Sequence, residues 1–258
     1  MLEPHKKELI TALVSVHLNT KESTDIVAGK GNGLVLLLHG PPGTDKTLTA
    51  ETVAELAEKP LYRVTCGDIA IDPRRVEKYF GSVLYIGTIW SCVVLLDEAD
   101  VFLEERTHTD LQRNALVSIF LRILEFCEGI LILTTNRVGT FDEALKSRIQ
   151  LAIEYPKLKM SGRREIWRGF IDSLRDSSDF LNIEELEGKL ESLADHELNG
   201  RQTRNIIKTA RQLARYKKEP LAYIHVDEAI NVASELANYV ARVRGHTDEE
   251  CIASQGIR

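Results

Sequence analysis

Hydrophobic residues follow two different patterns along this chain of 258 residues. Up to residue 156, short apolar runs alternate with longer stretches in which an apolar residue recurs every three or four positions. A short apolar run is typical of a strand buried on both faces, whereas the longer spacing is typical of an amphipathic helix. Five runs therefore predict strands, at residues 34–38, 61–66, 92–96, 130–134 and 149–155.

The stretches between these runs predict helices at residues 6–18, from Pro73 onward and at 110–126. Proline is favoured in the first turn of a helix, so Pro73 marks a start. Strands that alternate with helices form a parallel sheet with helices on both faces. We therefore predict a three-layer α/β/α domain over residues 1–156.

After Pro156 only helical spacing remains. It predicts helices at residues 164–174, 183–193, 201–216 and 226–241. We expect these to form a small all-α domain over residues 157–244. The polar stretch 245–258 is expected to be a disordered tail.

The composition excludes several classes of protein. A net charge of -6 and a pI of about 5.7 give no basic surface for nucleic acid. No apolar run reaches the roughly 18 residues of a membrane span, and the N-terminal residues lack the apolar core of a signal peptide. The four cysteines are far apart, which argues against a zinc site or a disulfide framework. We expect an intracellular, cytoplasmic-type protein.

A glycine-rich segment, GPPGTDKT at residues 40–47, lies between the first predicted strand and a helix-like stretch. In such loops, backbone N–H groups surround nucleotide phosphates, a lysine reaches the β- and γ-phosphates, and a hydroxyl ligates Mg²⁺. We therefore expect a P-loop that binds ATP and Mg²⁺. The residues expected at the nucleotide are Pro42, Gly43, Thr44, Asp45, Lys46, Thr47 and Leu48.

Polar residues follow two later strands of the predicted sheet. Asp97 and Glu98 end one apolar run, and Asn136 follows the next. The carboxyl ends of parallel strands meet at one edge, where ligands of such folds bind. An acid there can hold Mg²⁺ through water, its neighbour can polarise an attacking water, and an amide can orient that water. A solvated acidic turn and an ordinary turn asparagine are the alternatives.

The segment FDEALKSR at residues 141–148 predicts a short helical piece that ends in Arg148. An arginine that points outward could complete the site of a neighbouring subunit by donating charge to the transferring phosphate. A surface ion pair, for example with Glu143, is the alternative.

The order GPPGTDKT, VVLLDEAD, LTTNR, FDEALKSR and a helical lid resembles AAA+ ATPases of the AAA type over about residues 6 to 240. The phrases YRVTCGDI, VVLLDEADVFLEER and LQRNALVSIFLRILE are similar to AAA modules of uncharacterised filamentous-fungal ATPases. The resemblance implies an ATPase that drives conformational change in a partner or oligomer. It also implies a homo-oligomeric ring, a hexamer, acting on an unknown protein substrate.

The resemblance implies a role for each matching residue. Thr47 and Asp97 would hold Mg²⁺, and the lid residues Gly200 and Arg201 would contact adenine and the γ-phosphate, with Arg204 as a rival second sensor. The implied catalytic residues are Lys46 at the phosphates, Glu98 as the water-activating carboxylate, Asn136 as the first sensor and Arg148 as the finger acting in trans.

Asp45 is the largest departure from the family pattern, which has glycine there. A carboxylate ~5 Å from a phosphate charge at an effective dielectric of ~20 costs roughly 3 kcal/mol. Half of that would weaken affinity about tenfold. Asp45 could instead pair with Lys46. The alternative to an ATPase is therefore a non-hydrolysing nucleotide-binding scaffold, although the presence of Glu98, Asn136 and Arg148 favours the enzyme.

Two further departures concern the substrate-threading loop and the adenine clasp of the family. Residues 67–72 lack the usual aromatic-glycine pair, and Tyr79 and Phe80 fall inside a predicted helix, where core packing is expected. The clasp would fall at or before Met1. We interpret the chain as a short paralogue, a fragment or a gene model that lost an N-terminal domain.

Overall fold

The computed structural model describes residues 3–19, 33–65, 73–103, 105–106, 110–137, 141–175 and 181–244. Residues 67–72 and the predicted tail at 245–258 lie outside the described residues. The chain divides into two compact units, which we describe separately. The sheet unit comprises the chain up to Pro41 and Asp45–Pro156, and the helical unit comprises Pro42–Thr44 and the chain from Lys157 onward.

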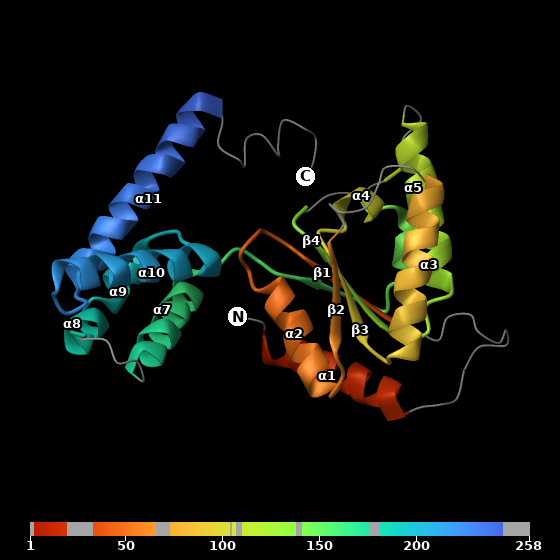
Figure 1. The fold of residues 1–258 in the computed structure, drawn as a ribbon, viewed down its shortest axis with the longest axis horizontal. Coiled ribbons are helices and arrows are strands. Elements are labelled where there is room, and N and C mark those ends of the chain that lie inside the picture. Colours follow the sequence, from red (N-terminus) through yellow and green to blue (C-terminus); the bar gives the residue numbers. More distant parts are fainter. Residues whose placement is uncertain are drawn as a thin grey trace. The chain divides into compact units, whose positions relative to one another are not determined.

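A five-stranded sheet forms the middle of the sheet unit, and every strand pair is parallel (Figure 1). The strand order is β2-β3-β4-β1-β5, so the central strands β3, β4 and β1 are flanked on both sides. The bounds of the strands are β1 Leu34–His39, β2 Leu61–Thr65, β3 Val93–Asp97, β4 Ile130–Thr135 and β5 Leu151–Glu154. The predicted parallel α/β sheet is confirmed.

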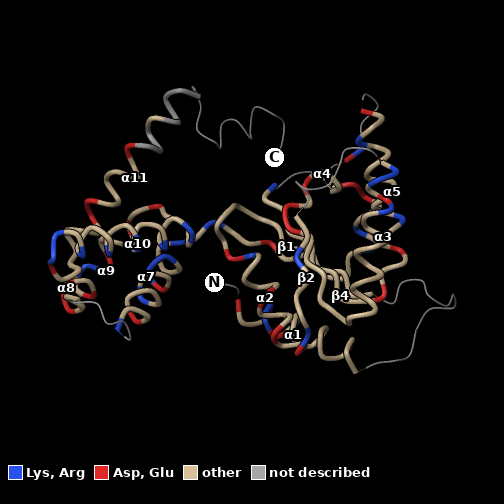
Figure 2. Tube along the Cα trace, viewed as in Figure 1, with Lys and Arg blue, Asp and Glu red and all other residues tan. Residues whose placement is uncertain are grey.

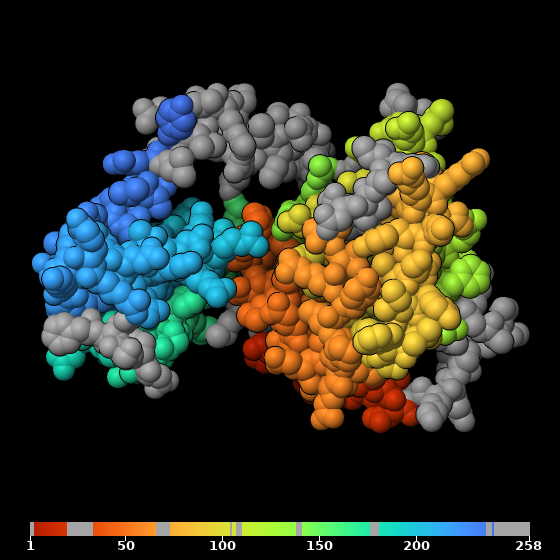
Figure 3. Space-filling model, in the orientation of Figure 1, coloured from red at the N-terminus to blue at the C-terminus, as the bar shows by residue number. Residues whose placement is uncertain are grey.

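Helices cover both faces of this sheet (Figure 1). Helices α1 (Pro4–Asn19) and α2 (Lys46–Leu56) pack on one face, and α3 (Pro73–Ile89), α4 (Asp100–Leu103) and α5 (Leu111–Glu125) on the other. In Figure 3, side chains of α2 and α3 form much of the visible surface of this unit. Strand side chains alternate between the two cores because their period is two.

The core under α3, α4 and α5 is centred on three aromatic rings. Phe80 lies 5.2 Å from Phe102 and 5.6 Å from Phe120, measured between ring centroids. Phe80 is fully buried, as expected, whereas Tyr79 on the same helix is 38% exposed. Helix α4 was not predicted, because four residues are too few to show a period.

The helical unit packs its helices around a core that includes Trp167, Ile171 and Leu193. Its helices are α7 Met160–Arg175, α8 Ile183–Gly188, α9 Leu190–Asp195, α10 Gly200–Lys217 and α11 Tyr223–Arg244. The single helix predicted at 183–193 is wrong, because the helix is interrupted at Lys189. Gly188 precedes this residue, and glycine is a poor helix former. The all-α character of this region is confirmed.

Charged residues are distributed differently over strands and helices. Figure 2 shows acidic and basic residues interspersed along the helices of both units, whereas the strands are almost entirely uncharged. Arg63 in β2, Asp97 in β3 and Glu154 in β5 are the charged strand residues of the described sheet. Among the described residues, none of the helices combines the length and apolar character that crossing a bilayer requires.

Candidate functional site

The glycine-rich loop leaves the end of β1 in a conformation that glycine permits. Gly40 has φ 140° and Gly43 has φ 73°. A Cβ atom on Gly40 would lie 2.2 Å from the backbone oxygen of Tyr155, so this position has no room for a side chain. The loop then enters α2, whose N-terminal N–H groups carry partial positive charge.

Asp45, the residue directly before α2, adopts the left-handed conformation with φ 66° and ψ 27°. This is the geometry for which the family uses glycine, and aspartate tolerates it better than most residues. Its side chain makes no capping hydrogen bond to α2. Although the residue is exposed, desolvation raises the pKa of its carboxyl group above the usual value. Because pairing with an ammonium group would lower that pKa, the direction argues against an Asp45–Lys46 pair.

Lys46 is buried at the start of α2. Its Nζ donates hydrogen bonds to the backbone oxygens of Gly40 and Pro41, both at 2.7 Å. Main-chain carbonyl groups of the glycine-rich loop therefore hold the Lys46 ammonium group beside the loop. Both of these acceptors are neutral carbonyl oxygens, and the positive charge of Lys46 suits an anionic ligand beside the loop.

Asp97, the last residue of β3, is the buried carboxylate at this edge of the sheet. Its Oδ1 accepts a hydrogen bond from the Thr134 hydroxyl at 2.5 Å and lies 3.4 Å from the Thr47 hydroxyl. Its Oδ2 accepts from the Arg63 guanidinium at 2.5 Å. The structure therefore brings together the two residues that the sequence predicts for Mg²⁺, Thr47 and Asp97.

Glu98 follows Asp97 in a left-handed turn with φ 58°, and its side chain is exposed. Its backbone N–H donates to the Thr134 hydroxyl at 3.0 Å, the same hydroxyl that donates to Asp97. Thr134 thus fixes the turn that separates a buried carboxylate from an exposed one. This difference matches the two predicted roles, a metal ligand and a group facing water.

Asn136, just beyond β4, is half-buried and held through its backbone. Its N–H donates to Asp100 Oδ1 at 3.2 Å, and the Thr135 hydroxyl bonds to the same oxygen. Asp100, the first residue of α4, therefore ties the end of β4 to the segment after β3. Glu98 and Asn136 consequently belong to one hydrogen-bonded edge of the sheet.

The donor set at this edge suits Mg²⁺ and a polyphosphate. Mg²⁺ prefers oxygen ligands and is usually held by one or two protein groups together with substrate phosphates. The Thr47 hydroxyl and the Asp97 carboxylate supply two such oxygens. Among the described residues there is no group of three or more His, Cys, Asp or Glu side chains that would form a self-sufficient metal site.

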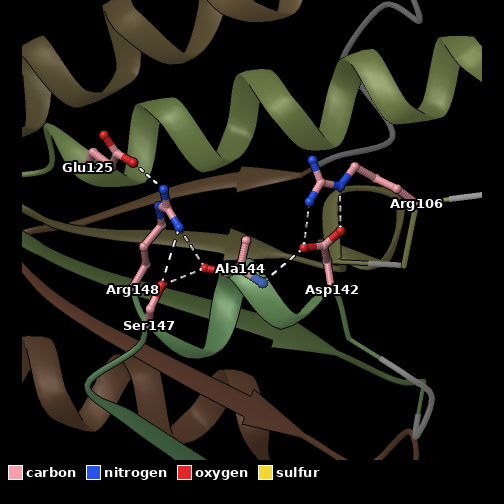
Figure 4. A network of polar contacts seen from close by, with 6 residues as sticks. All are labelled: Arg106, Glu125, Asp142, Ala144, Ser147 and Arg148. Atoms are coloured by element: carbon pink, nitrogen blue, oxygen red, sulfur yellow. Dashed lines mark hydrogen bonds and ion pairs between the residues drawn. The ribbon is translucent and has the colours of Figure 1, made fainter.

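Arg148 lies after α6 (Glu143–Lys146) and is held within its own chain (Figure 4). Its guanidinium pairs with Glu125 of α5 and donates to the backbone oxygen of Ala144 at 2.7 Å. The side chain is 24% exposed, and its buried Nε has no hydrogen-bond partner among the described residues. The alternative of an ion pair, for which Glu143 was the example, is wrong in its partner, because Arg148 pairs with Glu125 on a neighbouring helix.

The other end of α6 carries a second arginine pair, also visible in Figure 4. Arg106 Nε donates to Asp142 Oδ2 at 2.7 Å, and Asp142 caps α6 by accepting from the Ala144 N–H. Burial alone would raise the pKa of Asp142, but the hydrogen bonds from Arg106 and Ala144 outweigh it and lower that pKa. Both ends of α6 are therefore fixed by arginines.

The lid residues lie at the start of α10 in the helical unit. Asn199 caps this helix by accepting from the Gln202 N–H at 2.9 Å, and the Gln202 side-chain oxygen accepts from the Asn199 N–H at 2.8 Å. Gly200 is buried, whereas Arg201 and Arg204 are both exposed. Both arginines stay candidates for the second sensor.

Three residues at the sheet edge were missed by the sequence reasoning. Arg63 is an arginine inside an otherwise uncharged strand, and this contrast was the available signal. Asp100 is the second aspartate of the DEAD segment, and Thr134 begins the TTN segment. Their roles depend on which strands are neighbours, and spacing along the chain does not reveal that.

Two family descriptions together match residues 36–247 of the chain. The ATPase family associated with various cellular activities (AAA) matches residues 36–157, and the fungal AAA+ ATPase lid domain matches residues 158–247. A solved structure, described as the crystal structure of FIGL-1 AAA domain in complex with ADP, superimposes with a TM-score of 0.67. It is 20% identical and the match covers 96% of this chain and 89% of that one, so it supports the fold.

Curated relatives point to the same family. An ATPase family AAA domain-containing protein 3A homolog of Drosophila melanogaster is 27% identical over 67% of this chain and 28% of its own length. The ATP-dependent zinc metalloprotease FtsH of Alkalihalophilus pseudofirmus is 26% identical over 76% of this chain and 30% of its own. The chain thus spans less than a third of these relatives. It belongs to the AAA family of ATPases, as an ATP-binding AAA module followed by a fungal-type AAA+ lid domain.

Proposed function

We propose that the chain hydrolyses ATP to ADP and phosphate at the carboxyl edge of its sheet. The observation that carries this proposal is the convergence of three elements on Asp97. Thr47 from the start of α2, Thr134 from β4 and Arg63 from β2 all contact this buried carboxylate, and Lys46 is the residue directly before Thr47. A family member that had lost turnover long ago would have less reason to keep Glu98 beside this set.

Each residue at this edge has one proposed task. Loop N–H groups and Lys46 hold the phosphates, and Thr47 and Asp97 hold Mg²⁺. Mg²⁺ neutralises charge that develops on the phosphate oxygens. The exposed Glu98 takes a proton from water, and Asn136 orients that water toward the γ-phosphate. The protein then supplies position and charge more than covalent chemistry.

Arg148 is proposed to act on the nucleotide of a neighbouring subunit in a homo-oligomeric ring, a hexamer by family resemblance. An arginine in trans stabilises the charge of the transferring phosphate. In the single chain its guanidinium is bound by Glu125 and Ala144, so it has to leave these partners to reach a neighbour. Its unfilled Nε donor favours such an exchange, because a buried donor without a partner is costly.

The two proposed domains, residues 1–156 and 157–244, would respond to nucleotide together. Gly200 and Arg201 of the second domain would contact adenine and the γ-phosphate. ATP would then hold the domains together and hydrolysis would release them. The two arrangements of the domains would differ in their affinity for ATP, so ATP would favour one of them. This motion would be passed to a protein partner or to the ring.

Asp45 favours a second candidate function, a nucleotide-dependent scaffold without turnover. Its carboxylate stands beside the proposed phosphate position, and desolvation already raises its pKa. Bound phosphate would add further negative charge there and weaken ATP binding. The scaffold differs from the enzyme in one measurable respect, since it retains nucleotide and releases no phosphate.

Steady-state phosphate release across a series of protein concentrations tests the two candidates. For the enzyme, turnover per chain rises with concentration, and Glu98→Gln and Arg148→Ala each reduce it by about a hundredfold or more. The variant Arg122→Gln removes an arginine from an exposed pair with Glu77 and serves as the control. ATP retention without phosphate release in the wild type would favour the scaffold.

A further inference from the structure

Arg63 reaches the proposed Mg²⁺ ligand from the neighbouring strand. Strands β2 and β3 pair so that Thr65 lies beside Asp97. Arg63 is two residues before Thr65 and therefore points to the same face of the sheet as Asp97. Its guanidinium donates to Asp97 Oδ2 at 2.5 Å. The strand register therefore builds this contact.

The two partners differ in their access to solvent. The Arg63 side chain is 52% exposed, whereas that of Asp97 is only 9% exposed. A carboxylate in such a place needs a counter-charge, because an unpaired buried ion is costly. Arg63 belongs to β2 at the edge of the sheet, so it supplies this charge from outside while keeping most of its own hydration.

The contacts of Asp97 leave no oxygen without a donor. Thr134 and Thr47 lie at Oδ1, and Arg63 lies at Oδ2. A divalent cation that approaches this carboxylate therefore meets a guanidinium of the same sign. Metal and arginine compete for one negative charge. The fold holds the arginine beside that charge, so its effective concentration there is high.

We propose that Arg63 is a positioning residue that sets the Mg²⁺ requirement of nucleotide binding. It holds the Asp97 carboxylate in place without metal, and it raises the Mg²⁺ concentration at which the metal binds with nucleotide. This inference rests on the proposed nucleotide site. A role confined to folding would change stability alone, whereas this role also changes the response to Mg²⁺.

The test uses the full chain and a fluorescent ADP analogue, titrated across a Mg²⁺ series that starts in chelator. Arg63→Gln should lower the Mg²⁺ midpoint for ADP binding by about tenfold, because the competing charge is gone. Arg63→Lys keeps the charge and should stay within about twofold of the wild type. Arg122→Gln removes an exposed arginine elsewhere and should leave the midpoint unchanged.

A second measurement separates this inference from the proposed function. Thermal unfolding of the nucleotide-free chain is followed with and without Mg²⁺. Arg63→Gln should have a lower melting temperature without metal and a larger gain on adding Mg²⁺ than the wild type. If no chain binds ADP, the proposed function fails and this melting comparison decides the role of Arg63.

The proposal is overturned if Arg63→Gln binds ADP with an unchanged or higher Mg²⁺ midpoint. An equal gain of melting temperature with Mg²⁺ in the wild type and Arg63→Gln would also overturn it. Should Arg63→Gln fail to fold, Arg63→Lys decides. If Arg63→Lys lowers the Mg²⁺ midpoint by the tenfold that is expected for Arg63→Gln, the charge of residue 63 is not the cause.

Discussion

Two arginine–carboxylate pairs in the sheet unit use the same chemistry in opposite ways. In the pair of Arg63 and Asp97 the acid is buried and the arginine is exposed, at 9% and 52% of their side chains. In the pair of Arg148 and Glu125 both partners are similarly half-buried, at 24% and 27%. The first pair holds a buried carboxylate at the proposed Mg²⁺ position. The second holds back a cation that is proposed to act elsewhere.

The largest effect expected from this comparison is complementation between two inactive variants. Glu98→Gln damages the chain that holds the nucleotide, and Arg148→Ala damages the chain that supplies the arginine. Each alone should release phosphate about a hundredfold more slowly than the wild type or worse. A one-to-one mixture should regain activity, because about a quarter of the interfaces in mixed rings combine an intact Glu98 with an intact Arg148.

The matched control is a mixture of Glu98→Gln with Lys46→Ala, which both damage the nucleotide-holding side. An active interface needs one chain with both Lys46 and Glu98 intact. This mixture contains no such chain, so it should stay inactive. Phosphate release from both mixtures is measured at the same total protein concentration. Equal rates of phosphate release from the two mixtures would contradict the proposal that Arg148 acts on a neighbouring chain.

The next largest effect concerns the anchor at the other end of α6. Arg106→Gln should destabilise the chain by about 2 kcal/mol at neutral pH, because it removes a charged hydrogen-bond partner from the buried Asp142. The folded-state pKa of Asp142 is lowered. Its contribution is therefore fully present above the ordinary value of about 4 and is lost as pH falls through the folded value.

Urea unfolding at about pH 7 and about pH 3 measures this difference in the wild type and Arg106→Gln. The gap between their free energies of unfolding should shrink at the lower pH. A gap of constant size would mean that packing of the arginine, and not its charge, stabilises α6.

The substitution Asp45→Gly should strengthen ATP binding by about tenfold at a fixed Mg²⁺ concentration. Asp45→Asn separates the two contributions, because asparagine also tolerates the left-handed conformation but carries no charge. Calorimetric affinities of the three chains are compared. If the affinity of Asp45→Asn equals that of the wild type, the charge of Asp45 does not lower the affinity for ATP.

The smallest expected effect is on stability when Glu125 loses its charge. Glu125→Gln should change the free energy of unfolding by less than about 1 kcal/mol, because the pair is partly exposed and glutamine still accepts a hydrogen bond. Turnover in the oligomer should rise or stay equal, since Arg148 is released more easily. A fall in turnover with unchanged stability would indicate that Glu125 directs Arg148 toward the neighbour.

The sequence predicted the strands well because β1, β3 and β4 are buried on both faces and read as continuous apolar runs. It also predicted the polar residues at the ends of these strands, including Asp97 at the end of β3 and Asn136 just after β4. The partners of those residues were missed, because contacts such as Arg63 with Asp97 depend on strand order and register. The inward position of Arg148 depends on a helix 23 residues earlier in the chain.

Tyr155 occupies the last position before the covalent connection at Pro156. Its backbone oxygen lies directly against Gly40, and its hydroxyl donates to the Thr49 side chain of α2 at 2.7 Å. Tyr155 therefore contacts the chain both at the start of the glycine-rich loop and in the helix that follows the loop. A substitution that moves Tyr155 would therefore disturb the backbone at Gly40 and the first turns of α2 at the same time.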